Sequence, residues 1–225
     1  MTATTPNSPW TIKAIVITTG LLLIQLAAAY VIGSEHLLTS NAGTLLPPIA
    51  IMAVIPVVGF LAAYNLIPAF RAFVLAQDIR TLTMLQLWRV VGFVFLPLYA
   101  FGVLPGLFAW PAGIGDVAVG LLAFFVVSKI DRNPNFVTSP GFVRFHLLGL
   151  TDFVIAITTS ALAAGAIPAL IPGGVTSAAL DVWPLNIFPS FIVPAFMIAQ
   201  LSVLLKVREA RRISRGRVSP ALHAA

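Results

Sequence analysis

Six long apolar runs alternate with short polar segments along the chain. The runs cover about residues 11–32, 46–67, 83–104, 109–128, 143–167 and 184–206. A helix that crosses a bilayer needs ~20 mostly apolar residues, and each run reaches that length. Lipid offers the backbone no hydrogen-bonding partners, and the runs lack strict alternation of apolar and polar residues, so helices are expected rather than barrel strands. The pattern predicts an all-α, polytopic integral membrane protein with six transmembrane helices.

The composition agrees with this prediction and leaves no room for a separate soluble domain. Apolar residues make up 59% of the 225 residues and charged residues 9%, and the mean hydropathy is +1.01. We therefore expect three regions. A short cytoplasmic segment (1–10) precedes a six-helix transmembrane domain (11–206), and a basic cytoplasmic tail (207–225) follows it.

Basic residues are concentrated in alternate connections, which predicts the orientation. Lys13 opens the first run, Arg71 and Arg80 lie between the second and third, and Lys129, Arg132 and Arg144 lie between the fourth and fifth. The other connections, 33–45, 105–112 and 168–183, contain no Lys or Arg. Because Lys and Arg accumulate on the cytoplasmic side, both termini are predicted to be cytoplasmic.

The net charge of +6 comes largely from the C-terminal tail. Six of the thirteen basic residues lie within Lys206–Arg217. A basic cluster directly after a final span is typical of contact with anionic lipid headgroups, so nucleic-acid binding is not favoured. The chain has no cysteine, which excludes disulfides, thiol catalysis and thiolate metal sites.

Two boundaries remain open. Lys13, the apolar stretch after it and Ala27-Ala28-Ala29 would suit a signal peptide, although the stretch is longer than a usual signal core and favours an uncleaved anchor. Cleavage would leave five spans. The segment Pro68–Arg80 suits either a short helix lying in the membrane interface or a simple extension of the second helix.

Arg89 and Asp152 are ionisable residues inside predicted spans, where a charge costs ~2.5–3.5 kcal/mol on insertion scales. Arg89 follows Arg80 by nine residues, and Asp152 follows Arg144 by eight. At 1.5 Å per residue, both charges lie ~12–14 Å from the cytoplasmic end. Matching depth and opposite sign predict an ion pair, which either joins two helices or lines a path for a solute or proton.

Other polar residues could extend this layer. Gln86 precedes Arg89 by about one turn, and Gln200 in the last helix lies ~9 Å from the cytoplasmic end. Thr159 shares a stripe of small and polar residues with Asp152, which would allow close packing or line a cavity. His146 is placed ~3 Å inside its helix, at headgroup level.

Asp116 is a secondary candidate near the outer end of the fourth helix. A carboxylate in a first turn is favoured by the helix dipole and the free backbone N–H groups, so a capping role is expected. The string Gly113-Ile114-Gly115-Asp116 also resembles the GxGD motif of intramembrane aspartyl proteases, in which a second membrane aspartate completes the catalytic pair. That resemblance implies a pair with Asp152. In those families the other aspartate precedes the motif, whereas Asp152 follows it.

The sequence lacks the residues that several kinds of membrane-protein chemistry require. No lysine lies at mid-membrane depth for a retinal Schiff base, and a mid-membrane histidine pair for haem, an HExxH metal motif and a glycine-rich phosphate loop are missing. No cofactor or metal is therefore predicted.

Three functions remain. The first is a small-solute or proton-coupled transporter or channel with a buried polar layer. The second is a non-catalytic subunit or scaffold that contacts copies of itself or a membrane partner. The third, less favoured, is an intramembrane hydrolase using Asp116 and Asp152. The cysteine-free, basic-tailed composition favours the cell membrane, in particular a bacterial inner membrane.

Overall fold

The computed structural model describes residues 9–39, 47–166 and 174–218, and within them every regular element is a helix. The α-helices are α1 (Pro9–Ser34), α2 (Pro48–Leu66), α3 (Pro68–Ala76), α4 (Ile79–Met84), α5 (Phe95–Ala100), α6 (Gly106–Arg132), α7 (Pro140–Ala161) and α8 (Val193–Val218). Shorter segments are the 3₁₀ helices η1 (Leu85–Val94), η2 (Pro134–Thr138) and η5 (Ser177–Asp181) and the π-helices η3 (Leu162–Ala166) and η6 (Phe188–Ile192). The predicted all-α class is confirmed.

Five helical stretches in the described part are long and apolar enough to cross a membrane: Ile15–Ser34, Ile79–Ala100, Gly106–Arg132, Pro140–Gly165 and Phe188–Ile213. Counting the bent pair Ala50–Leu66 and Pro68–Ala76 as one span gives six. These stretches correspond to the six predicted runs and are consistent with a polytopic membrane protein. The last helix is longer than predicted: the predicted span ends at residue 206, whereas α8 ends at Val218.

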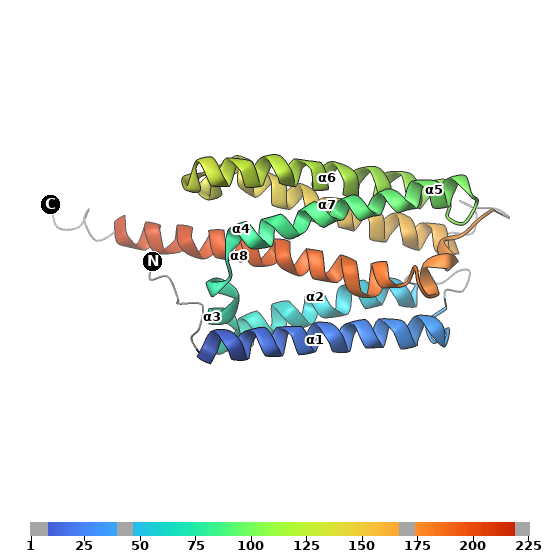
Figure 1. Cartoon of the computed structure of the whole chain (residues 1–225), viewed down its shortest axis with the longest axis horizontal. Helices are drawn as coiled ribbons and strands as arrows, with labels where there is room; N and C mark the ends of the chain where they lie inside the picture. The colour runs from blue at the N-terminus through green and yellow to red at the C-terminus, as the bar shows by residue number, and fades with distance from the viewer. Residues whose placement is uncertain (1–8, 40–46, 167–173, 219–225) are drawn as a thin grey trace.

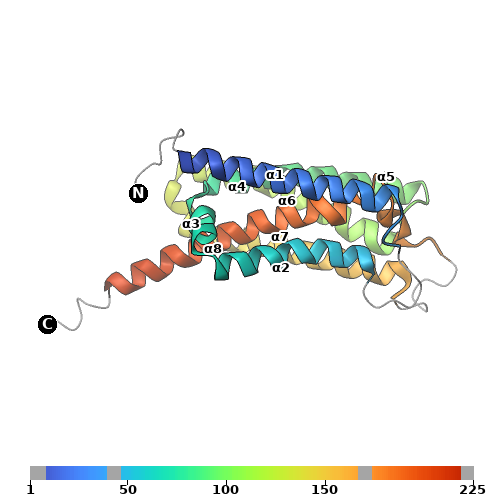
Figure 2. The same ribbon diagram turned by 90° about the horizontal axis from the view of Figure 1, so that it is seen from below.

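The helices form an antiparallel bundle in which α1 begins and α8 ends at the same end (Figure 1). That end carries Arg80 at the start of α4, Arg132 at the end of α6, Arg144 in the first turns of α7 and Arg211 near the end of α8. We call it the basic end and its counterpart the opposite end. The positive-inside rule predicts that the basic end is cytoplasmic. Helix α8 runs between the pair α1–α2 and the group α4–α7 and extends past them at the basic end (Figures 1 and 2).

Local signals set where three spans begin. The Asp78 carboxylate accepts a hydrogen bond from the Thr81 N–H at 2.7 Å and caps α4. Pro105 precedes α6 in an extended conformation, and the Ser139 hydroxyl accepts from the Phe142 N–H at 3.2 Å before Pro140 opens α7. Side-chain caps and a proline at or before the first helical position satisfy or remove N–H groups that a helix start leaves unpaired.

Helix α3 is separate from α2 and crosses the basic end (Figure 2). The axes of the two helices differ by 108°, with Ile67 extended between them and Pro68 opening α3. Lys206 of α8 donates to the carbonyl oxygens of Leu75 and Gln77 at the far end of α3. The straight extension of the second helix that the sequence left open is therefore wrong.

Helix α1 is held to the bundle through residues 183–190, which precede α8 and include part of η6. The Gln25 side chain donates to the Ser190 carbonyl at 2.9 Å, and Asn186 donates to the Ala29 carbonyl at 2.6 Å. The rings of Tyr30 and Trp183 meet edge to face, 5.1 Å between centroids. Gln25 thus serves to join α1 to η6.

Two buried apolar clusters lie along the bundle axis. The cluster nearer the basic end comprises Val119, Ala123, Val126, Ile130, Phe142, Phe145, Val203 and Val207. The cluster nearer the opposite end comprises Phe95, Leu104, Phe108, Ala109, Ala112, Ala163 and Leu180. Along α6 and α7 the gap between them falls at residues 113–118 and 146–162, which contain Asp116 and Asp152. A polar layer therefore separates two apolar cores.

Candidate functional site

A row of buried residues runs along one side of the third span, with a constant spacing of three: Thr83, Gln86, Arg89 and Gly92. The first three have no exposed surface. In an α-helix this spacing would wind the row around the axis, because three residues turn through only about 300°. Three members lie in the 3₁₀ helix η1, where side chains at i and i+3 eclipse and are about 6 Å apart along the axis. The unusual 3₁₀ geometry therefore keeps the row facing the bundle interior.

Arg89 is the centre of the polar layer. Its Nε donates to Asp116 Oδ1 at 2.8 Å, its Nη1 donates to the Gly149 carbonyl at 3.0 Å, and its Nη2 pairs with Asp152 Oδ2. The guanidinium carbon lies 3.7 Å from the centroid of the Phe153 ring, within the range of a cation–π contact. The expected Arg89–Asp152 pair is present, and Asp116 makes it a three-residue cluster joining η1, α6 and α7.

The cluster carries unequal charges. Arg89 is fully buried, and the side chains of Asp116 and Asp152 are 14% and 11% exposed. With both carboxylates ionised, one positive charge faces two negative charges, which leaves an excess of one negative charge inside the bundle. Uncompensated charge in a low-dielectric interior is costly, so this arrangement favours uptake of a proton or another cation.

Three glycines allow the helices to approach closely enough for these contacts. A Cβ atom at Gly115 would overlap Asp152 Oδ1, one at Gly92 would overlap the Asp116 carboxylate, and one at Gly149 would overlap the Gln200 amide. Each glycine on one helix thus makes room for the polar side chain of another. This arrangement could not be predicted from the sequence, because small-residue spacing does not show which side chain fills the space.

A second layer lies one step nearer the basic end. Gln200 of α8 donates through Nε2 to Gln86 Oε1 at 2.9 Å, and Gln86 Nε2 lies 3.5 Å from the Phe196 carbonyl oxygen. Both glutamine side chains are fully buried. The two residues predicted to extend the layer around Arg89 therefore meet each other next to it.

A third layer consists of Thr83 and His146, whose Oγ1 and Nε2 atoms are 3.5 Å apart. The imidazole has no exposed surface and packs edge to face against Phe142 and Phe145. His146 lies farther inside its helix than the predicted ~3 Å. Helix α7 begins at Pro140, three residues before the predicted span, which places His146 nearly two turns inside the helix.

Asp116 and Thr159 also differ from expectation. Helix α6 begins at Gly106, so Asp116 lies ten residues inside the helix and pairs with Arg89 instead of capping a first turn. Thr159 donates to carbonyl oxygens of its own helix, at Ile155 and Ala156. No hydrogen bond links Thr159 to the cluster among the described residues, and its role in a path stays a prediction.

A cavity of about 40 Å³ adjoins the cluster on the side of the opposite end, with room for a few water molecules. Of the described residues that line it, Asp116 alone carries a charge. The walls are formed by Ala50, Ala53, Phe95, Phe108, Ala112, Phe153, Ala156, Ile157, Ser160, Leu180, Phe188, Pro189 and Val193. The cavity therefore gives the Asp116 carboxylate a small, largely apolar approach.

Metal binding has no support in the described residues, where no group of three or more His, Cys, Asp or Glu side chains is arranged to hold an ion.

The fold and the charged layer define a class: helical bundles with membrane-spanning dimensions and an ionisable cluster in the interior. Within that class, the chain belongs to the family described as a domain of unknown function (DUF8737), whose model matches residues 46–208. The matched region contains all three polar layers and does not include α1. No curated protein and no solved structure matches the chain.

Proposed function

We propose that this protein transports protons, alone or coupled to a small solute, and that the Arg89–Asp116–Asp152 cluster is the proton-binding site. The observation that carries the proposal is the single guanidinium bonded to carboxylates from two other helices inside an apolar bundle. Such groups are costly at this depth, and in membrane proteins they mark ion and proton paths.

The charge count gives the cluster its chemistry. One proton on the two carboxylates would balance the positive charge of Arg89, and its release would restore the negative excess. The guanidinium of Arg89 acts as a fixed positive partner that holds both acids in place. Each carboxylate also keeps an oxygen that Arg89 does not contact, Oδ2 of Asp116 and Oδ1 of Asp152.

The size of the cavity that leads to the cluster supports transport rather than hydrolysis of a peptide bond. The cavity beside Asp116 has space for water or a very small solute and none for a polypeptide. In addition, the protease-like reading requires two aspartates that share a proton directly. Here the guanidinium of Arg89 bonds to both of them, so the hydrolase hypothesis is not favoured.

The test is charge movement after a rapid pH change, measured on protein reconstituted in vesicles adsorbed to a conducting support. Wild type is expected to give a transient current as protons bind, and Asp116→Asn and Asp152→Asn should each remove most of it. Asp131→Asn is the matched control, because Asp131 also pairs with an arginine but lies at the surface.

Currents that persist in both cluster variants would contradict the proposal. Absence of current in wild type, with the cluster variants losing only stability, would instead support the alternative of a scaffold or subunit in which the ion pairs only join helices.

A further inference from the structure

Two fully buried acceptor atoms lie between the proton site and the basic end. His146 Nδ1 and Gln200 Oε1 have no hydrogen-bonding partner, and neither side chain has exposed surface. Buried polar atoms are nearly always hydrogen-bonded, to protein or to ordered water, so this pair requires a partner.

The hydrogen bonds of Thr83 fix the state of the imidazole. Thr83 Oγ1 donates its only hydrogen to the Ile79 carbonyl at 2.8 Å, so toward His146 Nε2 it can only accept. Nε2 therefore carries the hydrogen of the neutral ring, and Nδ1 is left with a lone pair. The neighbouring Phe142 and Phe145 rings supply no donor.

The amide of Gln200 is oriented in the same way. Its Nε2 donates to Gln86, so Oε1 is an acceptor. The amide packs against Gly149, which follows His146 by three residues on α7, about 4.5 Å along the helix axis. The Gln200 amide therefore meets α7 within one helical turn of His146, and two acceptors cannot satisfy each other. A water molecule has two O–H donors and can satisfy both.

We propose that a buried water binds between His146 Nδ1 and Gln200 Oε1 and that His146 relays protons between the basic end and Asp152. This inference rests on the proposed function. The proton enters and leaves the ring at Nδ1, because Nε2 keeps its hydrogen toward Thr83. Uptake from the water gives an imidazolium ion. Return of that proton to the water, which passes one proton on to the Asp152 carboxylate, restores the neutral ring. One proton moves, and no other bond changes.

The neighbouring charges leave the ring free for this role. Arg80 of α4 is engaged by Asp131, and Lys206 of α8 is engaged by carbonyl oxygens at the end of α3. Farther along the row lies Arg89, which pairs with Asp116 and Asp152 on the side to which the proton would pass.

The test separates the rate of proton arrival from the capacity of the site. Full-length protein is reconstituted with one orientation, and pH jumps are applied at either face while the current is recorded. In His146→Phe the total charge moved should equal that of wild type. The rise after a jump at the basic end should slow at least tenfold, and the rise after a jump at the opposite end should not change. His36→Asn, at an exposed position after α1, is the control histidine.

A wild-type rate at the basic end in His146→Phe would overturn the relay while leaving the proton site intact. Absence of charge movement in wild type would overturn both proposals. If His146→Phe does not fold, Gln200→Met removes the second acceptor at similar side-chain length and is expected to slow the same rise; an unchanged rise would again overturn the relay.

Discussion

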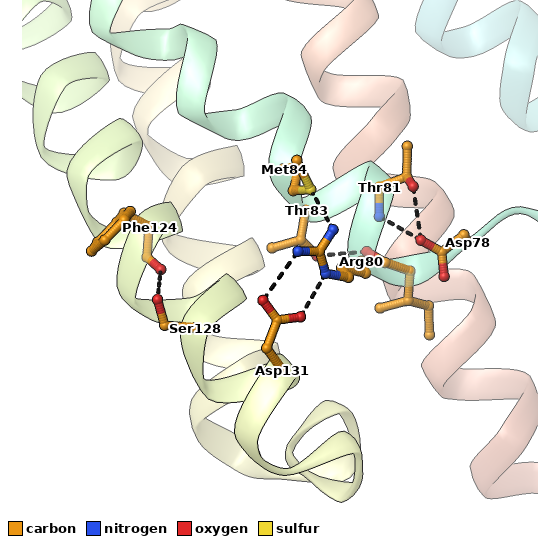
Figure 3. Close-up of polar contacts among 9 residues, drawn as sticks. Asp78, Arg80, Thr81, Thr83, Met84, Phe124, Ser128 and Asp131 are labelled. Carbon is orange, nitrogen blue, oxygen red and sulfur yellow. Dashed lines mark hydrogen bonds and ion pairs between the residues drawn. The ribbon is translucent and has the colours of Figure 1, made fainter.

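Two arginines on the same helical stretch, nine residues apart, pair with aspartates in opposite surroundings. Arg80 binds both oxygens of Asp131, at 2.6 and 3.1 Å, and the two side chains are 45% and 46% exposed (Figure 3). Arg89 is fully buried and binds Asp116 and Asp152 on two helices. The first pair has good geometry and one charge of each sign. The second has one positive charge for two negative ones and is largely buried.

The difference shows how burial changes the contribution of an Arg–Asp ion pair to stability. Water solvates Arg80 and Asp131 whether or not they pair, so exposed pairs contribute little. A buried charge has no such alternative, and removing one partner leaves the others uncompensated. The exposed pair can be lost without consequence, whereas the buried cluster must stay paired or change its protonation.

The largest effect is expected from Arg89→Gln, which leaves two carboxylates in the interior without a cation. We expect a loss of roughly 3–5 kcal/mol of stability, as found when buried ion pairs are broken from one side. Thermal unfolding in detergent and the yield of monodisperse protein measure it. Arg80→Gln is the control, and equal stability of the two variants would break the comparison.

Gly115→Ala tests the close approach of α6 and α7. The added Cβ would overlap Asp152 Oδ1, so α6 and α7 must separate or the carboxylate must leave Arg89. We expect a loss of about 1–3 kcal/mol, the usual cost of overpacking, measured by thermal unfolding. Gly20→Ala in α1 meets no atom within 4 Å and should be neutral or stabilising. Equal effects would show that α6 and α7 can adjust.

Asp116→Asn and Asp152→Asn sharpen the charge count. Each single variant leaves Arg89 with one carboxylate, so both should fold, with losses of about 1–2 kcal/mol from weaker hydrogen bonds. The double variant leaves Arg89 unpaired and should lose more than the sum of the two. The free energies of unfolding of wild type, the two single variants and the double variant are compared in a double-mutant cycle. Strict additivity would show that the two acids do not act through a common partner.

Asp78→Ala probes the exposed start of the same stretch. Burial raises the pKa of Asp78, but the hydrogen bonds from the Thr81 N–H and hydroxyl lower it more, so the net pKa is below the ordinary value of 3.8. A cap of this kind contributes about 1 kcal/mol, which Asp78→Ser should largely keep. Because the folded pKa is lowered, the contribution of the carboxylate is complete above the unfolded pKa and is lost as pH falls through the folded value. The difference in melting temperature between wild type and Asp78→Ala should therefore shrink below about pH 4. A difference that does not depend on pH would contradict a role for the ionised carboxylate.

Asp131→Asn should have the smallest effect. The pair with Arg80 is half exposed, so its melting temperature should stay close to that of wild type, and any difference should fall with added salt. A large loss that persists at high salt would show that the exposed pair resembles the buried one.

Much of the fold could be predicted because hydropathy alone sets the spans. The Arg89–Asp152 pair could be predicted as well, since each residue follows a basic residue near the start of its own span by nearly the same number of positions. Asp116 and His146 lie farther inside their helices than the sequence predicted. Helices α6 and α7 begin three residues before the predicted runs, at Gly106 and Pro140, so both residues lie deeper than expected.

Other parts of the site depend on contacts between helices. The constant spacing of three from Thr83 to Gly92 is visible in the sequence, but it indicates one buried row only if the helix is 3₁₀. The fit of Gly115 and Gly149 against Asp152 and Gln200 cannot be inferred from a single chain, because it depends on the rotation of three helices.

The most direct test of the proton site is an infrared difference spectrum between acidic and basic conditions, which detects the carbonyl band of a protonated carboxylic acid. Wild type should show a band from a buried acid that disappears in Asp116→Asn or Asp152→Asn and persists in Asp131→Asn. If no such band appears wherever the protein stays folded, both carboxylates remain ionised beside Arg89, and the cluster is a structural ion pair.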